Sequence, residues 1–327
     1  MTTLSFARRE TGRRDLETLR DRFGTLACSR LDDPEITDLL LNDGFLFEDR
    51  ESTGLSYIGA VDDHDAQAAI EMVASFAGEI VNRNSPYIEA TLPIRNARFI
   101  GYIQPITQKP CFAIRLPAAK IYTFEDYVIA QIATGRQIEI LEDAVRKKQN
   151  ILIAAGTKAG KSTLLNAILE AHNRFHPDMR IGLMEEIVEL QYQQRNVLAL
   201  RTGTDIDHQH ILKLLMRSRP DALVVGEVRD KAAMTLVKAS NTGHEPVLST
   251  IHANSARAAL GRMEDLCGEA LPGVSVRNQI ADALGIIVGI KRIDPADRLP
   301  GEPARRITEI IQIEGVTNGN YELSVLA

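Results

Sequence analysis

Apolar and polar residues alternate differently in the two halves of this chain, and the change falls between residues 118 and 130. Before it, short β-like runs surround one amphipathic helical stretch at 68–81. After it, apolar runs typical of buried strands alternate with helical stretches, which indicates a mainly parallel sheet covered by helices. We therefore predict an α+β domain at 1–117, a linker at 118–130 and an α/β domain at 131–327.

An arginine-rich segment opens the chain, and its Leu16, Leu19, Phe23 and Leu26 recur at helical spacing. This spacing predicts a helix with one apolar side. Acidic residues dilute the positive charge of the segment, so a helix packed on its own domain is favoured. The alternative is a helix that touches a membrane surface or a partner protein.

The rest of the first domain is predicted to form strands around one helix. Apolar runs at 39–42 and 45–48 flank Asp43-Gly44, which predicts a β-hairpin with a tight turn. Further β-like runs follow the predicted helix, at 88–92, 99–103 and 112–116.

The second domain has two kinds of strand. Short apolar runs separated by helical stretches predict parallel strands, at 151–154, 181–184, 223–225 and 247–251. The last apolar runs have no helices between them and are expected to add antiparallel strands to the sheet edge. They lie at 286–290, 307–313 and 321–325.

Composition narrows the class of protein. The 327 residues include 38 Lys and Arg against 44 Asp and Glu, a net charge of −6 that argues against a protein that mainly coats nucleic acid. Three well-separated cysteines without a C-x-x-C argue against a disulfide framework or a cysteine zinc site, and fit a reducing compartment. No apolar run reaches the roughly 18 residues of a membrane span, and no secretory signal opens the chain, so we expect a soluble, intracellular protein.

The strongest chemical signal is a phosphate-binding loop between a predicted strand and a predicted helix. It follows the G-x-x-x-x-G-K-[ST] pattern except that Ala155 replaces the first glycine, and Lys158 is unusual inside the loop. Its backbone N–H groups would surround the phosphates of a nucleoside triphosphate. Lys161 would reach the β- and γ-phosphates, and Ser162 would offer its hydroxyl to Mg²⁺. The predicted nucleotide-binding residues of the loop are Ala155, Gly156, Thr157, Lys158, Ala159, Gly160, Lys161, Ser162 and Thr163.

Acidic residues stand at the ends of two predicted strands. Glu185 and Glu186 follow one strand, and Glu227 follows another. Because parallel strands end at the same sheet edge as the phosphate loop, these carboxylates are expected to converge on a Mg²⁺-bound triphosphate.

Histidines flank another predicted strand of the second domain. His252 follows the strand at 247–251 and could sense the γ-phosphate, while His244 precedes the strand. Each taken alone is more often a structural histidine. His208 and His210 are interpreted as a polar loop before a helix rather than as a metal site, because no further ligand cluster accompanies them.

Taken together, these motifs resemble the secretion-ATPase superfamily of type II and type IV secretion. The similarity is greatest to conjugal-transfer ATPases of the TrbB type and to the VirB traffic ATPases. Four segments carry the resemblance: the phosphate loop at 155–163, an acidic box at 183–190, a Walker B stretch at 219–230 and a histidine box at 241–256.

The resemblance implies a homohexameric ring that uses ATP and Mg²⁺, with an N-terminal α+β domain before a RecA-like ATPase domain. It implies that Glu185 polarises the attacking water and that His252 senses the γ-phosphate. It further implies a metal set, interdomain nucleotide contacts and a charge-stabilising interface arginine. These are Ser162, Glu186 and Glu227 for the metal, Arg98 and Arg115 for the nucleotide, and Arg217 at the interface. Glu186 stands where the acidic box commonly has Asp.

The function implied by the resemblance is an ATPase that powers a type IV secretion or conjugal transfer apparatus at the inner face of the inner membrane. Its partners would be inner-membrane components of that apparatus, and no sequence-specific nucleic-acid binding is expected. The alternatives are a pilus-retraction or type II secretion motor, a DNA-translocating RecA-type ATPase, and a ring subunit that only binds nucleotide.

Overall fold

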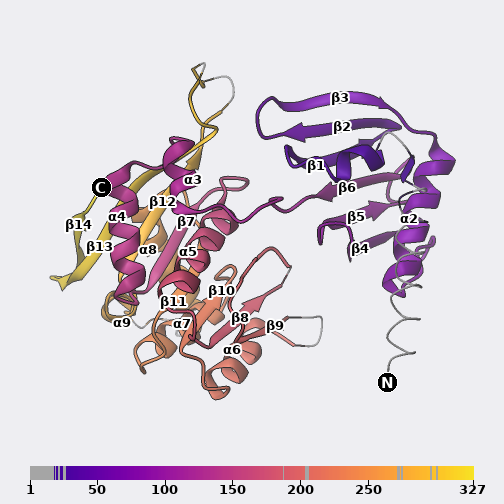
Figure 1. Cartoon of the computed structure of the whole chain (residues 1–327). Coiled ribbons are helices and arrows are strands. Elements are labelled where there is room, and N and C mark those ends of the chain that lie inside the picture. Colours follow the sequence, from indigo (N-terminus) through magenta and orange to yellow (C-terminus); the bar gives the residue numbers. More distant parts are fainter. Residues whose placement is uncertain are drawn as a thin grey trace. The chain divides into compact units, whose positions relative to one another are not determined.

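The computed structural model describes residues 18, 20, 23, 24 and 27–327, except 187, 203–205, 271, 272, 274, 295, 296 and 300. The chain forms two compact units, Met1–Ala119 and Lys120–Ala327 (Figure 1). Most of the arginine-rich segment predicted as a helix lies outside the described residues. Its Phe23 is described, and it is buried in the apolar core of the first unit.

The first unit is a six-stranded antiparallel sheet in the order β3-β2-β1-β6-β5-β4, with helix α2 packed on it (Figure 1). Ile70 and Val73 of the helix share one core with Phe99 and Ile88 of the sheet. In chain order the elements are β1 (Ile36–Asn42), β2 (Phe45–Arg50), β3 (Gly54–Ala60), α2 (Asp63–Ala77), β4 (Tyr87–Thr91), β5 (Arg98–Tyr102) and β6 (Cys111–Arg115).

Two predictions for this unit can be checked. The hairpin is confirmed, because Asn42 pairs with Phe45 and both Asp43 and Gly44 have positive φ. The helix lies earlier than predicted. It begins after the N-cap Asp62 and ends at Gly78, whose φ of 75° gives the left-handed C-cap that stops the helix.

The second unit is built on an eight-stranded sheet in the order β14-β13-β12-β7-β11-β10-β8-β9. The strands from β12 to β9 in this order run parallel, and β13 and β14 are antiparallel at one edge. The strands are β7 (Ile151–Ala155), β8 (Ile181–Glu185), β9 (Val197–Arg201), β10 (Ala222–Val225), β11 (Val247–His252), β12 (Ile286–Arg292), β13 (Arg305–Thr317) and β14 (Asn320–Val325).

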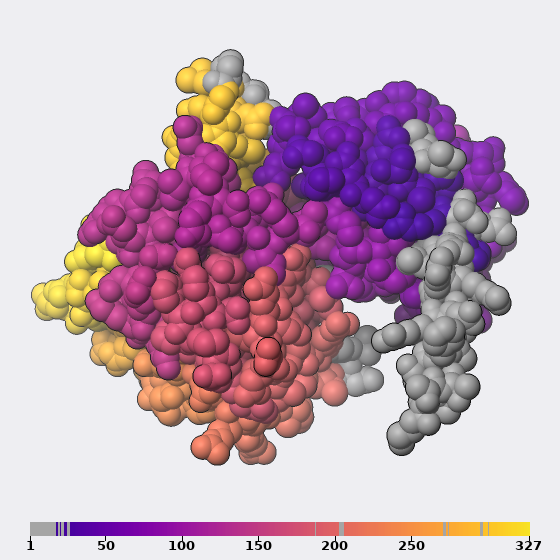
Figure 2. Space-filling model, viewed as in Figure 1, coloured from indigo at the N-terminus to yellow at the C-terminus, as the bar shows by residue number. Residues whose placement is uncertain are grey.

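Helices cover both faces of this sheet. Helices α3, α4 and α5 share one apolar core with the sheet. Helices α6, α7, α8 and α9 share a second core with its other face. Helices α4 and α5 lie in front of β7 in Figure 1, and the same face is closed over by side chains in Figure 2. The helices are α3 (Phe124–Ile129), α4 (Gly135–Arg146), α5 (Lys161–Phe175), α6 (His208–Arg217), α7 (Ala232–Ser240), α8 (Ala256–Ala270) and α9 (Arg277–Ala283).

Three details differ from the sequence-based expectation. β12 is parallel to β7 and only β13 and β14 are antiparallel, because α8 and α9 precede β12 and return the chain to the start of the sheet. The segment predicted as a linker contains α3, whose Phe124 and Tyr127 are buried in the second unit. His208 and His210 lie in the first turn of α6, which Asp207 caps, rather than in a loop. In the part of the chain described, no helix is long and apolar enough to cross a bilayer.

Candidate nucleotide-binding site

The phosphate loop joins the carboxyl end of β7 to the first turn of α5. Ala155 is the last residue of the strand and is buried, so an alanine serves where the motif usually has glycine. Lys158 takes a left-handed conformation with a φ of 59°. Gly160 has a φ of 94°, and a Cβ there would lie 3.0 Å from Cδ of Arg305. The turn therefore requires glycine at 160 but not at 155.

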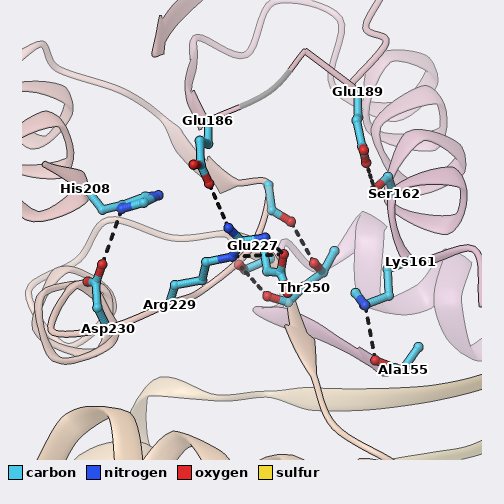
Figure 3. A network of polar contacts seen from close by, with 12 residues as sticks. Ala155, Lys161, Ser162, Glu186, Glu189, His208, Glu227, Arg229, Asp230 and Thr250 are labelled. Atoms are coloured by element: carbon cyan, nitrogen blue, oxygen red, sulfur yellow. Dashed lines mark hydrogen bonds and ion pairs between the residues drawn. The ribbon is translucent and has the colours of Figure 1, made fainter. Parts of the chain in front are cut away.

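The first two residues of α5 contact groups around the loop. Lys161 Nζ donates to the carbonyl oxygens of Ala155 and Gly156, each at 3.1 Å. Ser162 Oγ donates to Glu189 Oε2 at 2.6 Å (Figure 3). The ammonium group thus lies across the cradle in which phosphates would bind, and a carboxylate lies directly beside the hydroxyl.

Residues 188–191, which follow β8, lie beside the start of α5 and contact Ser162 and Asn166. Glu185, only 7% exposed, accepts hydrogen bonds at Oε2 from the backbone N–H groups of Glu189 (3.1 Å) and Leu190 (3.0 Å). Burial raises the pKa of the Glu185 carboxyl, and these two hydrogen bonds only partly offset the effect. Glu185 therefore fixes the backbone of the acidic box (residues 183–190) at Glu189 and Leu190. Its carboxylate is also more basic than that of an exposed glutamate.

Glu227 follows the end of β10 and belongs to a second cluster of acidic side chains, together with Glu186. Arg229 contacts Glu227 Oε2 at 2.5 Å and Glu186 Oε2 at 2.7 Å, so one guanidinium neutralises two of the predicted carboxylates (Figure 3). The Walker B turn is fixed to β11, because Thr250 Oγ1 donates to the Gly226 carbonyl at 2.7 Å. These contacts hold Glu227 at the carboxyl edge of the sheet.

His252 also lies at this edge, where it is the exposed last residue of β11 and pairs in register with Ala155. The sheet therefore brings His252 to the start of the phosphate loop, as the sequence predicted for parallel strands.

His244 and Arg217 lie at the opposite, amino edge of the strands. His244 precedes β11, and its ring nitrogens lie 3.3 Å from the carbonyl oxygens of Ala239 and Met216. This arrangement matches the structural interpretation of His244. Arg217 ends α6, next to Met216 in the chain, and its side chain is exposed. Within one chain, Arg217 is therefore separated from Lys161 by the length of the strands.

Arg98 and Arg115 belong to the first unit. They pair in register on β5 and β6 and so lie side by side on one face of the sheet. Arg98 has Glu89 at 3.8 Å, and Arg115 has Asp38 at 3.8 Å. Their predicted contact with nucleotide stays a prediction.

The donor atoms around Ser162 suit Mg²⁺. This cation prefers oxygen ligands and is usually held by one or two protein groups, substrate phosphates and water rather than by a protein cage. The described residues contain no group of three or more His, Cys, Asp or Glu placed to hold a metal ion. His208 instead faces Asp230, 3.3 Å away. A hydroxyl with one carboxylate beside it matches the Mg²⁺ pattern.

Two residues of the site were not singled out in the sequence. Glu189 contacts Ser162, and Arg229 joins Glu186 to Glu227. Both lie inside motifs that the sequence displays, the acidic box and the Walker B stretch, but only their partners in space show what they do.

Comparison with known proteins agrees with the motifs. A profile of the type II/IV secretion system protein family matches residues 79–309, more than half of the chain. The chain belongs to this family. Among its relatives, conjugal transfer protein TrbB of Rhizobium radiobacter is 37% identical over 305 residues, which cover 93% of this chain and 92% of that protein. The predicted membership of the secretion-ATPase superfamily is thus confirmed.

More distant type II/IV secretion relatives match as well. Type IV secretion system protein VirB11 of Bartonella henselae is 24% identical over 335 residues, covering 86% of this chain and 93% of its own. The solved structure of the pilus retraction motor PilT with bound ADP has a TM-score of 0.62 and 18% identity, covering 91% of this chain and 81% of its own. The latter likeness shows a common fold and confirms the predicted fold class.

Proposed function

We propose that this chain hydrolyses ATP with Mg²⁺ and that hydrolysis powers a type IV secretion or conjugal transfer apparatus. The observation that carries the proposal is the phosphate loop at the carboxyl edge of a parallel sheet, where Lys161 donates to the loop carbonyls and Ser162 donates to the Glu189 carboxylate. The 37% identity to conjugal transfer protein TrbB over nearly the whole chain supports the choice of apparatus.

The proposed chemistry relies on position and charge. Backbone N–H groups of residues 156–161 and the Lys161 ammonium would neutralise the phosphates, and Ser162 would hold Mg²⁺, whose charge would stabilise the negative charge that develops on the ADP leaving group. Glu185, with its raised pKa, would accept a proton from the attacking water. His252 would donate a hydrogen bond to the γ-phosphate from the end of β11.

The partners belong to the same proposal. We expect a homo-oligomeric ring, with six subunits as the resemblance implies, that acts on inner-membrane components of the apparatus from the cytoplasmic side. Arg98 and Arg115 would contact the nucleotide in such a ring, and Arg217 would be a charge-stabilising arginine at the interface.

The test is phosphate release from ATP and Mg²⁺ by the full chain and by Lys161→Ala. Removing the ammonium should lower turnover by about 100-fold or more, since it withdraws one preorganised charge from the transferred phosphate. Glu139→Gln is the matched control, because that side chain is 71% exposed on α4 and pairs only with Arg136 among the contacts described. Equal rates for Lys161→Ala and wild type would remove the proposal.

A further inference from the structure

Helix α6 runs beside the second unit's sheet from the edge with the phosphate loop to the opposite edge. It follows β9, whose carboxyl end lies at the first of these edges, and its last residue, Arg217, lies at the amino edge. The ten residues of the helix span about 15 Å at the usual rise of an α-helix. Leu212 and Leu215 are fully buried in the core of this face, so the helix is packed as one body. A movement of its first turn would therefore reach Arg217.

The first turn of α6 contacts the Walker B stretch through a histidine and a carboxylate. His208 Nδ1 lies 3.3 Å from Asp230 Oδ2, and the His208 side chain is only 18% exposed (Figure 3). An ionised aspartate only accepts hydrogen bonds, so it attracts this ring nitrogen when the nitrogen carries a proton. The other oxygen of Asp230, Oδ1, accepts from the backbone N–H of Ala232 at 2.8 Å, at the start of α7. One carboxylate thus joins the first turns of two helices.

A second contact holds the same two helices together. Gln209 Nε2 donates to Oγ1 of the buried Thr235 at 3.2 Å. The next residue, His210, has an exposed side chain that makes none of the contacts described, while its backbone N–H donates to the N-cap Asp207 at 2.7 Å. Residues 208 and 209 therefore connect α6 to α7, and His210 provides a comparison within the same turn.

Asp230 directly follows an arginine that lies among the carboxylates of the candidate site. Arg229 contacts Glu186 and Glu227, and the charge of Glu189 also acts on it. A Mg²⁺-bound nucleotide brings charges of both signs into this cluster and so competes for these partners. Asp230 has a φ of 49°, in the left-handed region where a residue other than glycine persists only if its contacts hold it. A shift of Arg229 would therefore be felt at Asp230.

We propose that His208 is a positioning residue through which the nucleotide site controls α6. Bound nucleotide changes the partners of Arg229, the turn displaces Asp230, and the contact with His208 passes the displacement to the first turn of α6. Because α6 ends at Arg217, the displacement reaches the surface where the proposed ring needs its interface arginine. His208 thus acts in coupling and not in the chemical step. The inference rests on the proposed function.

The experiment follows hydrogen exchange of the α6 backbone by mass spectrometry, in the full chain with and without a non-hydrolysable ATP analogue and Mg²⁺. In wild type, nucleotide should change the exchange rate of α6 by about 5-fold or more, the lower end of usual coupling between two sites. His208→Ala should bring this ratio close to 1. Calorimetry with the same analogue should show that affinity falls by no more than the lost coupling factor, because linkage is reciprocal.

Three further variants make the result specific to the contact. His208→Asn keeps an N–H that can face Asp230 and should retain most of the nucleotide effect, whereas His210→Ala should match wild type. Asp230→Asn keeps an oxygen for the Ala232 N–H but turns a donor towards His208. Combined with His208→Ala, it should cost little more than either change alone, because the two groups act as one unit.

The melting temperature of each nucleotide-free variant checks its folding. Should His208→Ala melt below the assay temperature, Asp230→Asn carries the same test, because it removes the contact from the other side.

The outcomes separate this proposal from the ATPase proposal. If wild type binds the analogue and α6 responds equally in His208→Ala, the role of His208 is overturned and the ATPase proposal stands. The same holds if α6 of wild type does not respond to nucleotide, or if His210→Ala loses the response as fully as His208→Ala. A wild-type chain that binds no nucleotide would overturn both proposals.

Discussion

Polar side chains in the second unit differ in whether they have hydrogen-bond or ion-pair partners. Glu189 and Arg229 have close partners near the phosphate loop, whereas His172 of α5 is fully buried. Among the residues described, neither ring nitrogen of His172 has a hydrogen-bond partner. Burial, followed by the charges of His176 and Lys148, lowers the pKa of His172 to about 3. This histidine stays neutral in the folded chain at pH values where it is protonated in the unfolded chain.

The low pKa of His172 predicts a loss of stability in acid. The folded-state pKa lies below the unfolded value of about 6.5, so the unfolded chain takes up the proton first as pH falls. The free energy of unfolding should therefore fall by about 1.4 kcal/mol per pH unit from about pH 6.5 downwards, or about 2 kcal/mol by pH 5. Urea unfolding across this range measures the slope.

His172→Leu should remove this contribution to the slope, whatever it does to stability at neutral pH. His64→Gln is the control, because the His64 side chain is 85% exposed on the first unit. The interpretation fails if His172→Leu and wild type lose stability in parallel between about pH 6.5 and 5.

At the scale of secondary-structure elements, the side chain of Asn150 connects several strands and helices at the amino edge of the second unit's sheet. Asn150 precedes β7, and its Oδ1 accepts from the backbone of Val247 at 2.6 Å. Its Nδ2 donates to Ser240 Oγ and to the Ala283 carbonyl, both at 2.8 Å. Asn150 thus connects the starts of β7 and β11 to the ends of α7 and α9, on the edge opposite the phosphate loop.

Asn150→Ala should destabilise the second unit by about 1–3 kcal/mol, because the buried Val247 N–H loses its acceptor. The Ala283 carbonyl keeps a donor in Ser240 Oγ at 3.0 Å, which limits the cost. Chemical denaturation measures the change, with the exposed Asn320→Ala as control. Nucleotide affinity of the folded variant should be unaltered, and a large loss of affinity would show that the two edges of the sheet are coupled.

At the scale of the whole molecule, the position of Arg217 allows a test of the proposed ring of identical subunits. Arg217 lies at the amino edge of the sheet and Lys161 follows the carboxyl end of β7. The five residues of β7 alone span about 16 Å at the usual rise of a strand. Arg217 could therefore stabilise charge on a triphosphate only in a neighbouring subunit.

Mixing two inactive variants tests that arrangement. Lys161→Ala and Arg217→Ala should each lack turnover, but Arg217→Ala should still bind nucleotide. A mixed assembly should regain about a quarter of the wild-type rate, since that is the chance that an intact phosphate loop faces an intact arginine across a repeated head-to-tail interface. Phosphate release after mixing measures this, with mass determination of the assembly. Absence of any recovery in confirmed mixed assemblies would exclude Arg217 as a residue acting between subunits.

Local patterns were enough to predict where most of the candidate residues lie in the fold. A buried strand, a glycine-containing loop and an amphipathic helix occur consecutively, so the phosphate loop with Lys161 and Ser162 could be read from neighbouring residues. The positions of Glu185, Glu227 and His252 followed from one further rule, that parallel strands end at a common edge.

Contacts between distant segments decided the rest. The approach of Glu189 to Ser162 depends on how the acidic box packs along α5, and the direction of β12 depends on the path of α8 and α9. The pairing of Arg229 with two carboxylates and the burial of His172 likewise require residues far apart in the chain. Apolar periodicity reports which side of an element is buried, but it carries no information about which distant polar group that element will meet.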